Sequence, residues 1–485
     1  SEYFLAGKSQ NWFVVGSSLF AASVSSSTLM GHSGEGFISG IAVFNYNVGA
    51  IFVIIFVSLF FLPFYIKSGI YTIPEYLGRR FDNRSRKYFS FITIIGNVFL
   101  DAGAALYTGA LILKIIFPEI DMMWIIIGMA LMAGTYTIIG GLSSAINADM
   151  IQSIILIAGS VLLSIFCFNS VGGWENFVEH FHDGVWLNLI RPNSDTTVPW
   201  FSIFLSIPIL GFYFWGNNQV IVQRVMSAKT VNEGRLGFLF VAFLYVFTLF
   251  IFIAPGMVGR MIDLFGVGDT LPNEIIDGNT LRAQYGIDTN EVYPRLILKL
   301  LPVGLIGVMI ACMVSALTST LSATLSSVST LFTMDFYKSW RPESSPRHLV
   351  RVGQWTSFIA LVVAVLWAPL IGKFASLVAY YQEFSSYLAP PIVGTFLVGL
   401  FWKGSTRNGA FAGLMSGLAM SALIMTYKFG FGGVVPFHFL LWVPILLILS
   451  VLVNIIVSKC DRNKETDVET YTWNKSVWQD DTREL

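Results

Sequence analysis

Apolar stretches, each long enough to form a membrane-spanning helix, follow one another along almost the whole chain. A helix needs about 17 to 25 residues to cross the hydrocarbon core of a bilayer. The pattern predicts about twelve spans, at residues 12–38, 43–65, 88–113, 124–140, 144–168, 200–226, 236–258, 301–332, 352–371, 374–402, 408–427 and 437–457. We therefore expect an all-α integral membrane protein that forms one polytopic domain over residues 1–485.

Two of these spans carry polar clusters that make a continuous helix unfavourable in lipid. The first holds Ser23 and the run from Ser25 to Thr28, followed by several glycines, and the sixth holds the run WGNNQ from Trp215. Unwound backbone at membrane depth is tolerated where it lines a buried cavity. Interrupted helices at positions one and six are typical of an inverted repeat of five plus five helices with a substrate site at the midplane. Ordinary polar kinks within a helix bundle are the alternative.

The inverted-repeat interpretation divides the chain into consecutive parts. The repeats cover about residues 10–170 and 198–403, extra helices follow at 404–458, and a cytoplasmic tail occupies 459–485. If successive loops alternate between the two sides, most of the 29 Lys and Arg residues fall on the side that holds both chain ends. The positive-inside rule then makes both ends cytoplasmic. Two loops on the other side, near 170–199 and 260–300, are long enough for short surface helices.

The composition excludes several functional classes. Hydrophobic residues make up 55% of the chain and charged residues 12%, about half the ~25% of a soluble domain. Lys+Arg and Asp+Glu are 29 each, so no basic excess indicates nucleic-acid binding. The sequence has no Walker loop, HExxH motif or nucleophile elbow. We therefore expect neither an ATP-driven pump nor an enzyme, and the bilayer is the expected surrounding.

Hydroxyl side chains crowd into the eighth span. Ser315, Ser319, Ser322 and Ser326 form a stripe on one helical face. A hard monovalent cation prefers oxygen ligands, and hydroxyls beside unwound carbonyls supply them without fixed charge. The stripe therefore indicates ion binding. The alternative is that small hydroxyl residues allow close helix packing and bond back to their own carbonyls.

Acidic and amide side chains within other spans are further candidates. Asp101 and Asp149 lie in the third and fifth spans, where a carboxylate is costly unless it is paired, hydrated or bound to an ion. Either could bind sodium or carry a proton. The Pro390-Pro391 pair predicts a kink that offers Gln382 to a central cavity, whereas Glu383 is expected nearer an end of that span. Gly409, Gly413 and Gly417 predict a face for close helix packing.

Several motifs resemble those of a known family. YFLAGK from Tyr3, IYTIPEYLGRRF from Ile70 and YTIIGGLSSA from Tyr136 resemble the sodium/solute symporter family. NQVIVQR from Asn218, STLFTMDFY from Ser329 and YYQEFSSYLAPP from Tyr380 narrow the resemblance to its sodium/glucose cotransporters. In that family a further helix usually precedes the first span seen here and another follows the last. The resemblance implies the leucine-transporter-type fold and sodium-driven uptake by alternating access.

The resemblance also implies sodium ligands. By similarity, the usual sodium site would use backbone carbonyls and hydroxyls of Ala21, Val24, Ala316, Ser319 and Thr320. A second sodium site in some relatives would use Asp149, Ser319 and Ser322, although Ala323 stands where those relatives have a further hydroxyl. Sodium is thus the expected coupling ion.

The implied solute site departs from that of the glucose carriers. Gln382, Trp215, Asn218 and Asp101 match positions that contact or enclose the sugar. Where glucose carriers have an amide, a His or Gln, a Glu and a Lys, this chain has Ser23, Thr28, Asn47 and Tyr245, and Phe214 replaces their usual Tyr.

We expect a symporter for a small polar solute, with a sugar as the first candidate. The alternatives are a polyol, an amine-bearing or carboxylate solute, a proton-coupled carrier, a channel, and a transporter-like sensor. The expected location is the plasma membrane, or the inner membrane of a bacterial cell.

Overall fold

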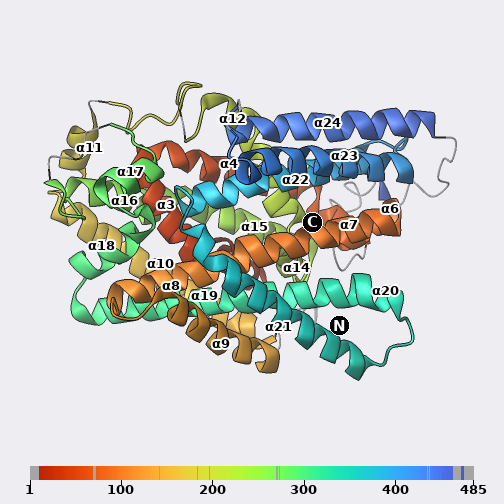
Figure 1. The fold of residues 1–485 in the computed structure, drawn as a ribbon, viewed down its shortest axis with the longest axis horizontal. Coiled ribbons are helices and arrows are strands. Elements are labelled where there is room, and N and C mark those ends of the chain that lie inside the picture. The colour runs from red at the N-terminus through yellow and green to blue at the C-terminus, as the bar shows by residue number, and fades with distance from the viewer. Residues whose placement is uncertain are drawn as a thin grey trace.

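The computed structural model describes residues 10–68, 73–140, 143–182, 184–195, 197–268, 271, 274–433, 435, 437–461 and 471–473. Helices packed side by side make up nearly all of this part of the chain, and most run along the long axis of the molecule (Figure 1). Only isolated bridges, Gln10 with Ala228 and Arg191 with Pro199, represent β-structure in the described residues. The expectation of an all-α protein is confirmed.

The elements of the first half of the chain run from Trp12 to His182. In order they are α2 (Trp12–Ser23), α3 (Ser26–Ser39), η2 (Gly40–Val43), α4 (Phe44–Phe60), α5 (Leu62–Ser68), α6 (Ile73–Arg80), α7 (Asn83–Ile95), the π-helix η3 (Gly96–Ala102), α8 (Gly103–Ile116), α9 (Met122–Gly140), α10 (Ser143–Ser170) and α11 (Trp174–His182).

The second half follows with a comparable set. It contains α12 (Trp200–Leu205), α13 (Ile207–Phe212), the π-helix η4 (Tyr213–Asn217), α14 (Gln219–Val225), α15 (Val231–Val246), η5 (Leu249–Ile253), α16 (Ala254–Met261), α17 (Gly278–Tyr285), η7 (Thr289–Glu291), α18 (Val292–Leu300), α19 (Val303–Leu331), η8 (Phe332–Tyr337), α20 (Lys338–Trp340), α21 (Pro346–Ile371), α22 (Leu377–Phe401), α23 (Arg407–Met425), η9 (Thr426–Gly430) and α24 (Phe439–Cys460). The expected surface helices are present as α11 in one loop and as α17 and α18 in the other.

Eight helical segments of the described residues are long and apolar enough to cross a membrane, or up to ten if two bent pairs each count as one span. Two shorter apolar helices, Trp12–Ser23 and Met122–Thr135, fall below that length. The number is lower than predicted because some spans are broken or bent, as in the pair Val231–Val246 and Leu249–Met261, which meet at 42°, and because only the described residues are counted, so that Met122–Thr135 is one part of α9.

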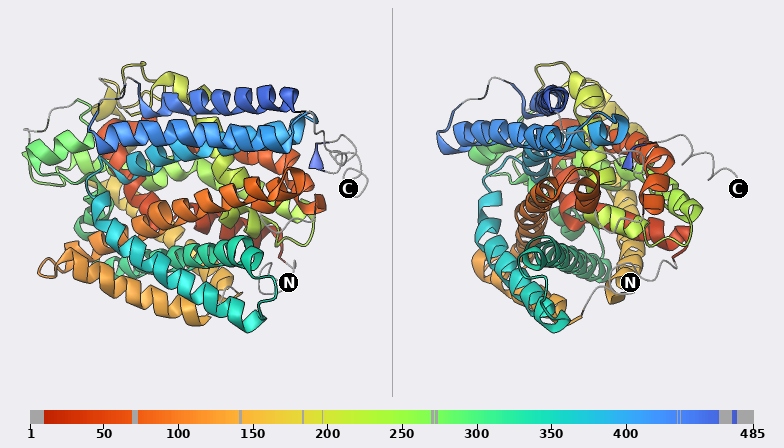
Figure 2. Two further views of the ribbon diagram at one scale, coloured as in Figure 1. Left: turned by 45° about the vertical axis from the view of Figure 1, so that its right-hand side comes forward. Right: turned by 90° about the vertical axis from the view of Figure 1, so that its right-hand side faces the viewer.

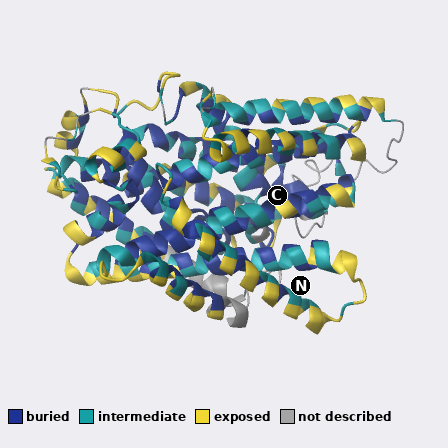
Figure 3. Cartoon of the chain, viewed as in Figure 1, coloured by how far each residue is buried: buried dark blue, intermediate teal, exposed yellow. Residues whose placement is uncertain are grey.

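The outer surface of the bundle is apolar where a bilayer would contact it. Large hydrophobic side chains such as Trp355 and Leu366 on α21 and Ile448 and Ile456 on α24 are 54 to 66% exposed. The interior is mostly buried, and exposed positions follow the outer faces of the peripheral helices (Figure 3). A contiguous apolar surface of this kind is expected of a protein whose solvent is lipid.

Glycines allow α3 to contact the segment formed by η5 and α16. A methyl group on Gly256 would overlap the carbonyl group of Ser33, and one on Gly36 would overlap that of Ile253. Without side chains at these points, the backbones approach closely enough to hold α3 against its neighbours. The expected packing role of the α23 glycines is confirmed, since Gly413 lies against Ser450 on α24.

Positively charged helices gather at one end of the bundle. The arginine-bearing helices α6 and α7 and the Lys338 helix α20 lie together at the right of Figure 1, and Figure 2 shows the same end in two further views. Arg86 on α7 pairs with the buried Asp335 of η8 at 2.6 Å. Trp473 donates a backbone hydrogen bond of 2.8 Å to Leu400 O, beside this end. Charged side chains and the last described residues thus share one face.

Candidate functional site

The first interrupted helix breaks at Val24 and Ser25, between α2 and α3. Both residues have non-helical backbone angles, and the Ser25 hydroxyl accepts a hydrogen bond from Thr28 N to begin α3. The last four carbonyls of a helix have no intrahelical donor, and in α2 these belong to Ala21, Ala22, Ser23 and Val24. Thr28 Oγ1 donates to Ser23 O at 3.2 Å. The break therefore presents backbone oxygens at the centre of the molecule.

The second interrupted helix breaks at Asn218, between η4 and α14. Asn218 has an extended backbone, and its side-chain oxygen accepts from Val220 N at 2.9 Å, which begins α14. The preceding π-helical turn, Tyr213–Asn217, carries Trp215, which is buried. Both breaks lie in the segments that the sequence predicted.

A central cavity of about 210 Å³ lies between these two breaks. Its walls come from α2 and α3 on either side of the first break, from α4, η3, α8, α13, η4, α15, η5 and α22, and from Thr320 of α19. It is lined by all the predicted solute residues except Asn218, namely Ser23, Thr28, Asn47, Asp101, Trp215, Tyr245 and Gln382. The tertiary fold thus brings together residues from distant parts of the sequence.

Hydrogen bonds fix several of these walls. Asn47 on α4 donates its amide to Thr248 Oγ1 at 2.8 Å, and Thr248 donates to Tyr245 O at 2.6 Å. Ser26 donates to Met313 O at 2.8 Å, which joins α3 to α19. Since these groups are buried, the bonds hold the cavity walls against one another.

A smaller cavity of about 70 Å³ adjoins the central one. Five residues line both, namely Ala22, Val24, Asp101, Phe214 and Thr320. All five residues predicted for the usual sodium site line the smaller cavity, namely Ala21, Val24, Ala316, Ser319 and Thr320, and Asn218 lines it too. Carbonyls at the end of α2 and hydroxyls on α19 therefore border one small space. Such neutral oxygen donors suit a hard monovalent cation.

The structure does not bring every candidate to these cavities. Ser322 is buried in α19 and lines neither of them, and Ser315 and Ser326 of the hydroxyl stripe do not line them either. Asp149 falls within the bounds of α10, but its side chain lies outside the described residues. No group of three or more His, Cys, Asp or Glu residues that could hold a metal ion occurs in the part of the chain that is described.

Glu383 lies in the second turn of α22, near an end of the span as the sequence suggested, but its side chain is buried. It is buried on α22 and forms an ion pair with Lys428 of η9, and Tyr387 OH donates to it at 3.2 Å. The ring of Phe384 stacks on Phe429 beside this pair. The carboxylate is compensated by a lysine that directly follows the predicted span at 408–427, a pairing that the sequence did not indicate.

Several cavity residues were missed by the sequence analysis. His32 lies one turn after Thr28 on α3, and its Nδ1 is 3.0 Å from Thr28 O. Helical spacing from Thr28 could have identified it. Tyr381, beside Gln382, and Tyr213, beside Trp215 in the sequence, also line the larger cavity. Tyr46 stands between Asn45 and the predicted solute residue Asn47, so its neighbours could have identified it, whereas Phe252 lies in an apolar run and carried no sequence signal.

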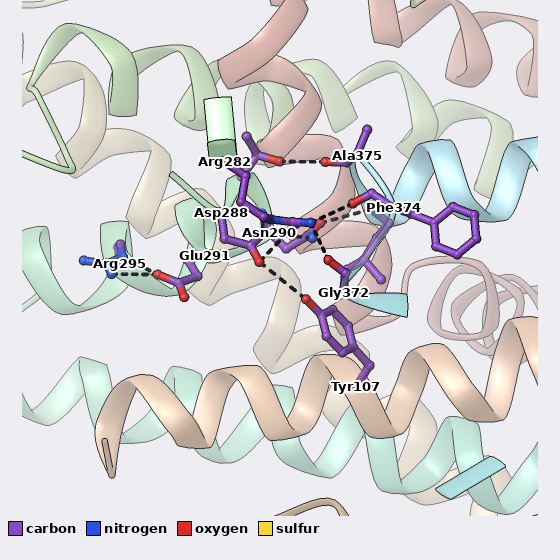
Figure 4. Close-up of polar contacts among 11 residues, drawn as sticks. Tyr107, Arg282, Asp288, Asn290, Glu291, Arg295, Gly372, Phe374 and Ala375 are labelled. Atoms are coloured by element: carbon purple, nitrogen blue, oxygen red, sulfur yellow. Dashed lines mark hydrogen bonds and ion pairs between the residues drawn. The ribbon is translucent and has the colours of Figure 1, made fainter. Parts of the chain in front are cut away.

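A polar cluster joins the loop elements α17 and η7 to the turn that precedes α22 (Figure 4). Arg282 pairs with Asp288 at 3.2 Å and donates to Phe374 O at 3.2 Å. Asn290 accepts from Leu377 N at 3.0 Å, and Leu377 lines the larger cavity. The cluster therefore connects the surface helices to the wall of the cavity.

Two interrupted helices that meet at adjoining central cavities define a secondary transporter of the broken-helix type. Residues 3–417 match the model of the family described as "Sodium:solute symporter family". The chain belongs to this family. It is therefore a sodium-coupled symporter and a multi-pass membrane protein, and it is not an enzyme.

Named relatives and a solved structure agree with this assignment. The chain is 31% identical to sodium/glucose cotransporter 1 of Oryctolagus cuniculus, over 94% of this chain and 74% of that protein. It is 33% identical to a sodium/mannose cotransporter of Bos taurus, over 88% and 74%. The structure of a Na⁺-coupled sialic acid symporter in a substrate-bound outward-open state superposes with a TM-score of 0.77, at 24% identity, covering 96% of this chain and 93% of that one. The fold is the leucine-transporter-type inverted five-plus-five repeat with extra C-terminal helices.

Proposed function

We propose that this symporter imports a sugar or a closely related polyhydroxylated solute, and that the larger cavity is its binding site. The observation that carries the proposal is the convergence of Ser23, Asn47 and Gln382 on one cavity with Trp215. Hydroxyl and amide groups can hydrogen-bond sugar hydroxyls, while an aromatic ring packs against the apolar face of the solute. Relatives named for glucose and mannose transport support the same substrate class.

Sodium in this proposal binds in the smaller cavity, between the carbonyls of Ala21, Val24 and Ala316 and the hydroxyls of Ser319 and Thr320. An ion there bridges the end of α2 to α19 and so orders the break that also borders the solute cavity. A ligand that binds one conformation better shifts the population toward it. Ion and solute therefore favour the same closed arrangement, which then opens to the other side. A second ion at Asp149, Ser319 and Ser322 is a separate proposal.

The sodium gradient supplies enough free energy for accumulation. One charge moving through 100 mV contributes about 2.3 kcal/mol, and a tenfold concentration difference adds about 1.4 kcal/mol. One sodium per solute thus supports several-hundredfold accumulation.

The membrane orientation is also part of the proposal. Both chain ends are assigned to the cytoplasm and the protein to the plasma membrane, with repeats at about residues 10–170 and 198–403. The gathering of α6, α7 and α20 at one end supports this orientation, because positively charged loops favour the cytoplasmic side.

The test is uptake into proteoliposomes that contain the purified full-length protein. Labelled hexoses and polyols are offered with an inward sodium gradient, and a choline gradient serves as the control. We expect saturable, concentrative uptake of at least one hexose with sodium only. Solute-dependent stabilisation without uptake would instead indicate a sensor, and accumulation with choline at fixed pH would indicate coupling to protons.

A further inference from the structure

Asp101 is the one carboxylate among the described residues that line both cavities. It lies in the π-helical turn η3, which leads into α8, and it lines both the solute cavity and the smaller cavity. In the described part of the chain, its carboxylate has no hydrogen bond or ion pair with the protein. A carboxylate within a membrane protein is costly unless a counter-charge compensates it.

The surrounding residues do not provide that counter-charge. The described residues that line the solute cavity include neither lysine nor arginine, and Asp101 is the only carboxylate among them. Arg224 lines the smaller cavity, but its guanidinium donates to Ser18 Oγ at 3.0 Å and to Val220 O at 3.2 Å. No ion pair joins the described side chains of Arg224 and Asp101.

The rest of the solute cavity is rich in aromatic rings. They come from α4, η4, α15, η5 and α22 and include Tyr46, Tyr213, Trp215, Tyr245, Phe252 and Tyr381. Tyr213 and Tyr381 line the same cavity as Asp101. Aromatic faces attract cations, and the attraction strengthens when water is excluded. A carboxylate among aromatic faces is therefore an environment for an organic cation.

We propose that the solute carries an ammonium group that pairs with Asp101 when the site closes. This inference rests on the proposed function, because Ser23, Asn47 and Gln382 still bind hydroxyl groups of the same solute. The combination favours an amino sugar over a neutral sugar. A neutral sugar would leave the carboxylate without a counter-charge in the closed site, whereas an ammonium group compensates it.

The experiment compares D-glucosamine, N-acetyl-D-glucosamine and D-glucose as inhibitors and substrates of sodium-driven uptake by the full-length protein. The assays are run below neutral pH, where the amine of glucosamine is protonated. We expect the wild-type protein to favour glucosamine over both neutral sugars by at least tenfold in half-saturating concentration. This comparison needs no variant and so does not depend on whether a mutant folds.

Two variants then assign the preference to Asp101. Asp101→Asn keeps the size of the side chain and its capacity for hydrogen bonds but removes its charge, and should abolish the preference for glucosamine over the neutral sugars. Glu119→Gln removes a carboxylate from an exposed loop and should retain the wild-type preference. The thermal unfolding of each purified variant is measured in parallel.

The outcomes separate this inference from the proposed function. Sodium-driven uptake of glucose or N-acetylglucosamine without preference for glucosamine overturns the inference and leaves the symport of sugars intact. A loss of sodium affinity in Asp101→Asn with the glucosamine preference retained also overturns it, since Asp101 would then serve the ion. Failure to accumulate any of the three with sodium would contradict the proposed function itself.

Discussion

Thr320 Oγ1 donates a hydrogen bond of 3.0 Å to Ala316 O, so two oxygens predicted to bind sodium lie side by side on one turn of α19. Both residues line the smaller cavity. Because the hydroxyl proton points to the carbonyl, the lone pairs of Thr320 Oγ1 remain free to accept an ion. The helical hydrogen bond thus orients the Thr320 oxygen so that its lone pairs can bind a cation.

The first prediction concerns these hydroxyls. The double substitution Ser319→Ala and Thr320→Ala should abolish the sodium dependence of uptake, because it removes the two hydroxyl groups that are proposed to bind the ion in the smaller cavity. The measurement is initial uptake rate against sodium concentration. Thr318→Ala is a matched control, since Thr318 makes the same type of bond, to Val314 O at 2.9 Å, but lines neither cavity. A wild-type sodium response in the double variant would refute the ion-site assignment.

The second prediction concerns Gln382. Gln382→Ala should raise the half-saturating solute concentration about tenfold, because a lost hydrogen bond in a buried site costs about 1 to 3 kcal/mol. The maximal rate and the sodium response should change much less. The measurement is uptake rate against solute concentration, with Gln354→Ala on the exposed face of α21 as control. An unchanged half-saturating concentration in Gln382→Ala would remove this residue from the solute site.

The third prediction tests the close contact of α3 with α16. Gly256→Ala should destabilise the protein by about 1 to 3 kcal/mol, because the added methyl group overlaps the Ser33 carbonyl and forces the helices apart. Gly307→Ala on α19 should be neutral or slightly stabilising, since a methyl group there meets no atom within 4 Å. Thermal unfolding of the purified protein measures both effects. Equal stability of the two variants would contradict the close contact.

The fourth prediction concerns the ion pair of Glu383 and Lys428. Lys428→Met should destabilise the protein by about 1 to 2 kcal/mol, because it leaves a buried carboxylate without its cation. The effect should be smaller than for a fully buried pair, since the Lys428 side chain is 35% exposed and water screens the interaction. Adding Glu383→Gln to Lys428→Met should recover part of the loss. Additive effects in this double-mutant cycle would mean that the two side chains are not coupled.

The fifth prediction tests the orientation in the membrane. Cys460 is exposed at the end of α24, whereas Cys167 and Cys312 are buried. A membrane-impermeant maleimide should label the protein in permeabilised cells but not in intact cells. Glu119→Cys places a thiol in the exposed turn after α8, on the opposite side, and should be labelled in intact cells. Labelling of Cys460 in intact cells would reverse the proposed orientation.

The sequence by itself determined the class of the fold and the places where helices break. Apolar stretches long enough to span a bilayer leave few alternatives to helices, because lipid cannot satisfy backbone hydrogen bonds. The polar runs at Ser25 and Asn218 mark the breaks for the same reason. The family motifs then selected residues such as Ser319 and Gln382, which the structure places at the two cavities.

Tertiary structure alone decided which side chains meet. Glu383 of α22 pairs with Lys428 of η9, and Phe252 lines the solute cavity from an apolar segment that carries no polar pattern. The hydroxyl stripe on α19 likewise divides, since Ser319 faces the smaller cavity and Ser322 does not. Periodicity tells which residues share a helical face, but the partner of that face depends on how the helices pack. Only the packed bundle shows that Asp101 lies between both cavities.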